Sequence, residues 1–127
     1  MKAILKHVRV SPKKASLVAG LVRGKGVGEA LNFLKFLPKK AGKILWKIVR
    51  SAACNAENNF GQDQKALKIS RILVTKGRTL KRGVPASRGR VAPIKKRTSH
   101  ITVEVAATSA SKQPAQEPTQ EKVEKKN

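Results

Sequence analysis

Aromatic residues are scarce in this sequence, which has three Phe, one Trp and no Tyr among 127 residues. Sheets that bind single-stranded nucleic acid stack the bases on aromatic side chains, so a protein of that class is not expected here. Phe33 and Phe36 lie in an apolar segment with helical spacing. We predict that they pack within the protein rather than against bases.

Cysteine is nearly absent as well. Cys54 is the only one in the sequence, so no internal disulfide can form, which is usual in a reducing compartment. His7 and His100 lie far from Cys54 and from each other along the chain, and this scatter does not match the ligand spacing of a zinc site. We therefore expect neither a metal nor a cofactor.

Long apolar runs are also missing. No segment approaches the roughly 20 apolar residues that a membrane-spanning helix needs. The first ten residues, MKAILKHVRV, lack the long apolar stretch and the small-residue cleavage site of a secretory signal. We expect no membrane partner and predict a cytoplasmic protein.

Acidic residues are few, with seven Asp and Glu against 29 Lys and Arg and a net charge of +22. Residues 106–127 hold four Lys and three Glu, so the first 105 residues keep 25 basic and four acidic side chains. Such an excess in a folded body predicts a polyanionic partner, with nucleic acid first. The four acids of that part are isolated from one another in sequence and form no carboxylate pair, so we predict that the protein is not an enzyme.

The apolar pattern predicts an α+β fold in which one strand and three helices are followed by two strands. In the first strand, residues 3–10, Ile4, Val8 and Val10 are expected to share the buried face. The other expected elements are helices at 12–23, 29–37 and 39–58 and strands at 67–76 and 100–105.

The first helix has clear boundaries in the sequence. Ser11 is a good N-cap, and Pro12 suits the first helical position because the N–H that it lacks would have no partner there. Gly24 can end the helix in a left-handed conformation. Its expected apolar stripe consists of Leu17, Val18, Leu21 and Val22.

Residues 76–97, KGRTLKRGVPASRGRVAPIKKR, contain nine Lys or Arg and no acid. They lie between the two final strands, so we predict a long β-hairpin arm with its turn around 83–90. Ten residues in each strand would reach about 33 Å from the body. An isolated two-stranded ribbon is marginally stable in water, so we expect the arm to become ordered against RNA or DNA.

We divide the chain into one domain, residues 1–106, which includes the arm at about 76–98, and a tail at 107–127. The tail is rich in Ala, Gln, Pro, Lys and Glu and has one aliphatic residue beyond alanine, Val123. This composition predicts a disordered segment.

Three segments together resemble the bacterial large-subunit ribosomal protein twenty-two family: SPKKASLVA, NAENN and KRTSHITV, in this order. The resemblance covers residues 3 to about 105. It implies a small domain of three helices on a short antiparallel sheet with a long hairpin extension. It also implies a structural constituent of the large ribosomal subunit that binds its rRNA, aids its assembly and lines the nascent-peptide exit tunnel with the hairpin.

The resemblance and the charge pattern together give the expected site residues. The partners that they imply are large-subunit rRNA, neighbouring ribosomal proteins and the nascent peptide chain, with the protein a monomer within the ribosome. Residues expected to bind rRNA are Arg9, Lys13, Lys14, Arg23, Lys25, Lys43, Lys47, Arg50, Lys76, Arg78, Arg88, Arg90, Lys95, Lys96, Arg97, Thr98, Ser99 and His100. The tip expected to line the tunnel consists of Leu80, Lys81, Arg82, Gly83, Val84, Pro85, Ala86 and Ser87, with Lys81 and Arg82 facing the tunnel.

A second interpretation is open at this point. An architectural DNA-binding protein could grip a duplex with the same cationic arm and wedge Pro85 between two base steps. Proteins of that kind usually dimerise to present two arms, so the oligomeric state distinguishes the two interpretations.

Overall fold

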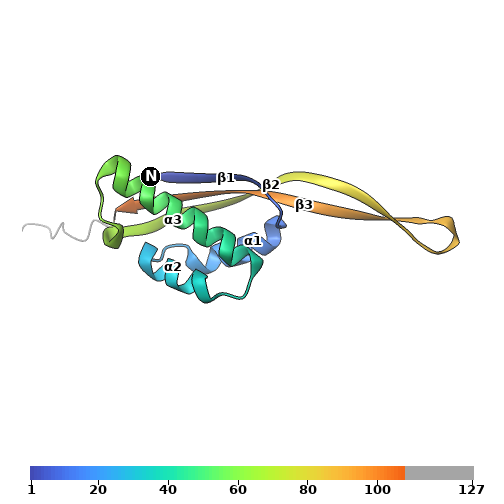
Figure 1. Ribbon diagram of the computed structural model, residues 1–127, viewed down its shortest axis with the longest axis horizontal. Coiled ribbons are helices and arrows are strands. Elements are labelled where there is room, and N and C mark those ends of the chain that lie inside the picture. The colour runs from blue at the N-terminus through green and yellow to red at the C-terminus, as the bar shows by residue number, and fades with distance from the viewer. Residues whose placement is uncertain (108–127) are drawn as a thin grey trace, which may run out of the picture.

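Three strands form one antiparallel sheet with the order β1-β3-β2, and three helices accompany it (Figure 1). The structure is a computed structural model and describes residues 1–107. Its elements are β1 (Lys2–Val8), α1 (Pro12–Val22), α2 (Val27–Phe36), α3 (Lys40–Phe60), β2 (Leu67–Pro85) and β3 (Val91–Ala107), with short 3-10 helices at Gln64–Ala66 and Ser87–Gly89. The predicted α+β fold with a hairpin arm is confirmed.

The boundaries of α1 follow from its sequence. The Ser11 hydroxyl accepts a hydrogen bond from the Lys14 backbone N–H at 3.5 Å, and Pro12 is the first helical residue. Gly24 follows the helix with φ +79°, a left-handed conformation that glycine adopts without steric cost. The predicted start and end of this helix are confirmed.

The core lies between the helices and one face of the sheet. The sheet contributes alternate residues of its paired strands, among them Ile72, Ile101 and Val103, and α3 contributes the largest share from the helices. The fully buried Leu45 lies in the second turn of that helix. The apolar pattern predicted for α3 is confirmed by the burial of Ala41, Leu45, Ile48, Val49, Ala52, Ala53 and Ala56.

Two leucines of α1 do not lie where the sequence predicts. Leu17 is 75% exposed and Leu21 is 50% exposed. The buried stripe of α1 has the spacing i, i+3, i+4, i+7 and consists of Ala15, Val18, Ala19 and Val22. The small alanines face the core, so the two larger leucines lie on the flank of the helix.

For the first strand, the predicted burial of Val10 is confirmed and Val8 is half-buried, but the prediction is wrong for Ile4, and it is also wrong for the two aromatics of α2. Ile4 is 53% exposed, whereas its neighbour Ala3 is buried and pairs with Val103 in the centre of the sheet. Because adjacent strand residues point to opposite faces, Ile4 cannot share the buried face with Ala3. On α2, Phe33 is 38% exposed and Phe36 is 81% exposed, so these aromatics do not belong to the core.

Two β-bulges set the register of the long hairpin. The pairing shifts between Ile69 and Arg71 and again between Lys76 and Thr79. At the second bulge, two residues of β2 lie opposite Thr98 of β3. The Thr98 hydroxyl donates a 2.6 Å hydrogen bond to the Arg78 carbonyl oxygen, which fixes the bulge at the base of the arm.

The arm extends well beyond the helices as a two-stranded ribbon (Figure 1). Pairing continues to Pro85 opposite Val91, and all residues from 81 to 97 are exposed. The ten residues from Lys76 to Pro85 span about 33 Å at the usual rise of a strand. The predicted tail lies outside the described residues, apart from Ala107, which ends β3.

Candidate nucleic-acid interface

A cationic groove lies where α1, the turn between α2 and α3, and the base of the arm meet. Its volume is about 890 Å³. Apolar side chains of Leu17, Leu21, Leu37 and Pro38 line part of it, which explains why the two leucines of α1 can remain exposed. Its cations are Arg9, Lys14, Lys39, Lys40, Lys95 and Arg97.

Four of these six cations are among the predicted rRNA-binding residues, and they come from separate elements. Arg9 follows β1, Lys14 lies in the first turn of α1, and Lys95 and Arg97 belong to β3. The fold brings them together at one groove. Within the described residues, none of the six forms an ion pair.

Sequence reasoning missed Lys39 and Lys40. They follow Pro38 and lie at the start of α3, where the chain turns back toward α1. The only sequence signal is a pair of lysines beside a helix-ending proline. That signal shows a turn but not which surface the turn faces.

Two predicted cations have partners within the protein. Arg23 Nη2 donates a hydrogen bond to the Ile72 carbonyl oxygen at 3.0 Å. Lys25 Nζ lies 3.3 Å from a Glu29 carboxylate oxygen and 5.1 Å from the centre of the Phe33 ring. Both side chains are therefore held against the body.

The predicted cations of α1 and α3 outside the groove lie on exposed helix faces. Lys13, Lys43, Lys47 and Arg50 are all exposed. The Arg50 guanidinium lies 5.3 Å from the centre of the Trp46 ring, which orders its stem along the helix. Lys47 lines a second groove, between α3 and β1, rather than the cationic groove.

The arm presents two different faces because neighbouring strand residues alternate. Lys81 pairs with Lys95 and Thr79 with Arg97, so these cations share one face, which continues into the cationic groove. Like charges directly opposite each other destabilise an isolated ribbon. The opposite face carries Leu80, Arg82, Val84, Ala92, Ile94 and Lys96.

Lys81 and Arg82 therefore lie on opposite faces of the ribbon, and only one of them can point to a given partner. The remaining predicted tip residues, Gly83 to Ser87, are exposed and complete the end of the ribbon. In the turn, Arg88 adopts φ 58°, and the Ala86 N–H donates to the Arg90 carbonyl oxygen at 2.7 Å. The side chains of Arg88 and Arg90 are exposed beside this turn.

At the base of the arm, Thr98 and Ser99 are buried and His100 is half-buried. Ser99 has no exposed surface, so in this conformation its side chain cannot contact an RNA partner. His100 Nδ1 accepts a hydrogen bond from the His7 backbone N–H at 3.0 Å. The two imidazole rings lie edge to face, with their centres 4.6 Å apart. These residues position the arm, and the exposed cations Lys76, Arg78 and Lys96 lie beside them.

Two further features are absent from the described part of the chain. No three His, Cys, Asp or Glu side chains among residues 1–107 are grouped as a metal site would require. None of the helices described for this chain is both long and apolar enough to cross a membrane.

The sequence also matches known proteins. The profile of the family described as ribosomal protein L22p/L17e matches residues 3–106. Two relatives named large ribosomal subunit protein uL22, from Desulforamulus reducens and Clostridioides difficile, are each 52% identical to this chain over 104 residues. The match covers 82% of this chain and 92% and 94% of the two relatives, respectively. The chain therefore belongs to the ribosomal protein L22p/L17e family.

Proposed function

We propose that this protein binds large-subunit rRNA through the cationic groove and the adjoining face of the arm, and thereby aids assembly of the subunit. As a family member it is a structural protein of the large ribosomal subunit and works in the cytoplasm. The observation that carries the proposal is the convergence of six cations from separate elements on one groove. Closely spaced RNA phosphates supply the negative charge that the described part of the chain does not.

The groove suits RNA in shape as well as in charge. Its apolar side chains, Leu17, Leu21, Leu37 and Pro38, offer a surface for a ribose or a base, and the cations around them can hold the phosphates on either side. Recognition of this kind depends on backbone geometry rather than on base edges, as is usual where RNA is bound by shape. DNA binding remains the alternative only through the arm, and family membership favours the ribosome.

The outer arm is proposed to line the nascent-peptide exit tunnel. The two faces of the ribbon would have different partners. The cationic face with Lys81 and Lys95 would lie against rRNA, and the face with Leu80, Arg82 and Val84 would contact the nascent chain. Arg88 and Arg90 at the turn hold further phosphates. The outer ribbon is exposed along its whole length because the body of the protein does not pack against it. RNA would provide the surface against which it packs.

Sedimentation tests the ribosomal part of the proposal. Native protein from a lysate should migrate with the large subunit in a one-to-one amount on a gradient at roughly 0.5 M salt, which strips loosely held basic proteins. Recovery on chromosomal DNA instead would contradict rRNA binding. We expect a single copy per subunit, which excludes the paired arms of a DNA clamp.

Crosslinking tests the tunnel part separately. A photoreactive residue at Val84 should crosslink to a stalled nascent chain, whereas the same residue at Lys95 should crosslink to rRNA. The reverse pattern would contradict the division of the two faces, and nascent-chain crosslinks at neither position would contradict the tunnel assignment.

A further inference from the structure

The two outer edges of the sheet are treated differently by the fold. The edge of β2 is covered: Ile69 exchanges backbone hydrogen bonds with Gly24 and Lys25 at 3.1 and 2.9 Å, and the Arg23 side chain donates to the Ile72 carbonyl oxygen at 3.0 Å. Proteins commonly cover sheet edges because unpaired backbone groups can accept a further strand. Among residues 1–107, the edge of β1 has no backbone cover of this kind, and its one side-chain contact is made at the Lys2 carbonyl by Asn55.

The pairing of β1 with β3 shows which backbone groups lie on that open edge. Met1 and Val105 exchange both backbone hydrogen bonds at 2.8 Å, and the register then runs without a break to Leu5 opposite Ile101. In an antiparallel pair, hydrogen-bonded and non-hydrogen-bonded residues alternate, so the N–H and C=O groups of Lys2 and Ile4 point away from β3. The Lys2 carbonyl accepts a 3.5 Å hydrogen bond from Asn55 of α3, as this geometry requires.

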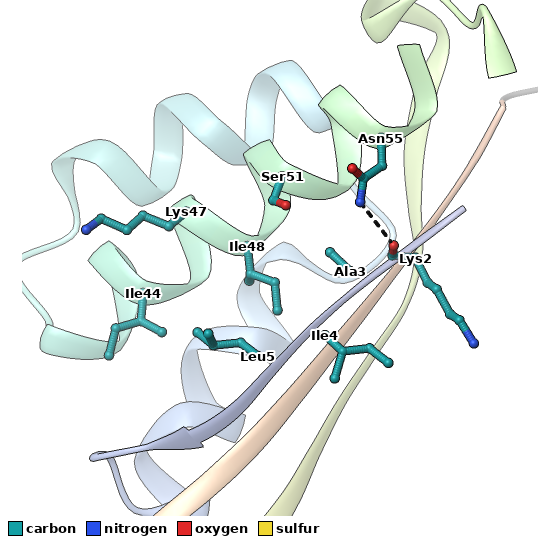
Figure 2. A pocket seen from close by; sticks show the side chains of 9 residues that line it. All are labelled: Lys2, Ala3, Ile4, Leu5, Ile44, Lys47, Ile48, Ser51 and Asn55. Atoms are coloured by element: carbon teal, nitrogen blue, oxygen red, sulfur yellow. Dashed lines mark hydrogen bonds between the residues drawn. The ribbon is translucent and has the colours of Figure 1, made fainter. Parts of the chain in front are cut away.

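A groove of about 410 Å³ runs beside this edge, between β1 and α3 (Figure 2). Ile44 and Ile48 of α3 and Leu5 of β1 give it an aliphatic lining, and Figure 2 shows their side chains gathered in the space between helix and strand. Ser51 is small and exposed, which leaves room in the middle of the groove. Lys2 and Lys47 are its only charged lining residues.

We propose that this groove takes an extended segment of a second protein, which adds to the sheet as a fourth strand along β1. The segment would pair with the outward backbone groups of Ile4 and place every second side chain, aliphatic in type, against Ile44, Ile48 and Leu5. Acidic side chains at the alternate positions of the segment would meet Lys2, whose side chain points away from α3 in Figure 2. An edge strand beside a helix is the arrangement that peptide-binding domains use for this mode of recognition.

Two other occupants fit the surface less well. In a dimer paired through β1, Lys2 and Lys6 of one copy would lie close to Lys2 and Lys6 of the other. Neither strand has an acidic residue to offset this repulsion. An RNA strand would meet Lys2 and Lys47 with its phosphates but would not fill the aliphatic lining. The inference goes beyond the proposed rRNA binding and concerns a different face of the molecule from the cationic groove.

The test uses the full chain assembled into large subunits, with a photoreactive residue at Ser51. We expect crosslinks to one protein segment in which aliphatic and acidic residues alternate. Crosslinks only to rRNA, or none, would overturn the proposal. The same photoreactive residue at Lys40, in the cationic groove, serves as the reference and should crosslink to rRNA. If Lys40 gave no rRNA crosslinks, the proposed function would be contradicted but the β1 site would not.

Two substitutions at Ile4 separate strand addition from simple proximity. Ile4→Pro removes the outward N–H but no hydrogen bond to β3, and proline is tolerated at such edge positions. It should lower the Ser51 crosslink yield about tenfold, the effect of losing one well-formed hydrogen bond together with the strand geometry. Ile4→Val keeps the N–H and should retain the yield. Equal yields for the two variants would overturn the strand model.

Amide exchange provides a readout that does not depend on the folding of a variant. In the unmodified chain, the amides of residues 2–8 should exchange at least about tenfold more slowly in the assembled subunit than in the free protein, because a new strand protects the outward N–H groups. An unchanged exchange rate in that segment would overturn the proposal.

Discussion

Deletion of residues 81–90 is expected to leave the stability of the body almost unchanged. All ten residues are exposed, so the deletion removes no buried side chain from the core. Leu80 and Lys96 remain paired, and the five residues 91–95 are left to connect them, a length that suits a hairpin loop. The deletion also removes Lys81, which lies opposite Lys95 and repels it.

These considerations set the expected magnitude. Changes that bury nothing and break no cap usually alter the free energy of unfolding by less than about 1 kcal/mol. In a domain of this size that corresponds to a shift in Tm of about 5 °C or less. The assay is thermal unfolding followed by circular dichroism, with the shortened and complete proteins compared in the same buffer.

Leu45→Ala is the matched destabilising control. Leu45 has no exposed surface, and a leucine-to-alanine change in a core costs about 2–5 kcal/mol. Its Tm should fall by more than about 10 °C. A fall of that size in the arm deletion would refute the conclusion that the arm contributes nothing to the body. The shortened protein should also still migrate with the large subunit, because Lys95 is the one groove cation that falls in the new loop and the other five keep their places.

The remaining predictions concern the base of the arm and the groove. Gly77→Ala should destabilise the protein by about 1–3 kcal/mol, because a Cβ there would lie 2.6 Å from the Thr98 hydroxyl oxygen. In Gly83→Ala, the new Cβ would contact only the exposed Val91 side chain, so Tm should be unchanged. Equal Tm values for the two variants would contradict the packing at the bulge. Leu17→Asp should keep Tm but weaken affinity for an rRNA fragment about fivefold near physiological salt, since its carboxylate offsets one cation; Leu17→Asn should bind normally, and equal affinities would contradict an RNA contact there.

The arm could be predicted from the sequence because each of its signals is local. Period-two alternation marks the inner parts of β2 and β3, and the complete lack of acids between them predicts an external partner for the outer part. The start of α1 is local in the same way, since Ser11 and Pro12 determine it within one turn.

The register of the sheet could not be predicted, because it depends on how strands pair. The bulges beside Ser70 and Gly77 each add a residue to β2 and move later side chains to the other face. In β1, the choice of Ala3 rather than Ile4 for the buried face follows from the pairing of Ala3 with Val103. A hydrophobic pattern alone favours the larger side chain.

The groove was only partly predictable, for a related reason. The sequence identifies cations but not the tertiary contacts that collect them, so Lys39 and Lys40 were not distinguished from other exposed lysines. The exposure of Leu17 and Leu21 likewise follows from the close packing of α1 through its alanines. Helical periodicity does not separate the buried stripe from its flank.

The central claim is that the cationic groove holds rRNA phosphates, and the salt dependence of binding tests it most directly. Affinity of the complete protein for a large-subunit rRNA transcript would be measured between about 50 and 200 mM salt. Neutralisation of six phosphates predicts a log–log slope of about −4 to −5. Glutamine at Lys14, Lys39, Lys40 and Lys95 should bring that slope about three units closer to zero. Glutamine at four exposed lysines elsewhere, Lys6, Lys35, Lys65 and Lys68, should change it by less than about one unit. Equal slopes for the two quadruple variants would contradict the account, because the position of the cations would then not matter.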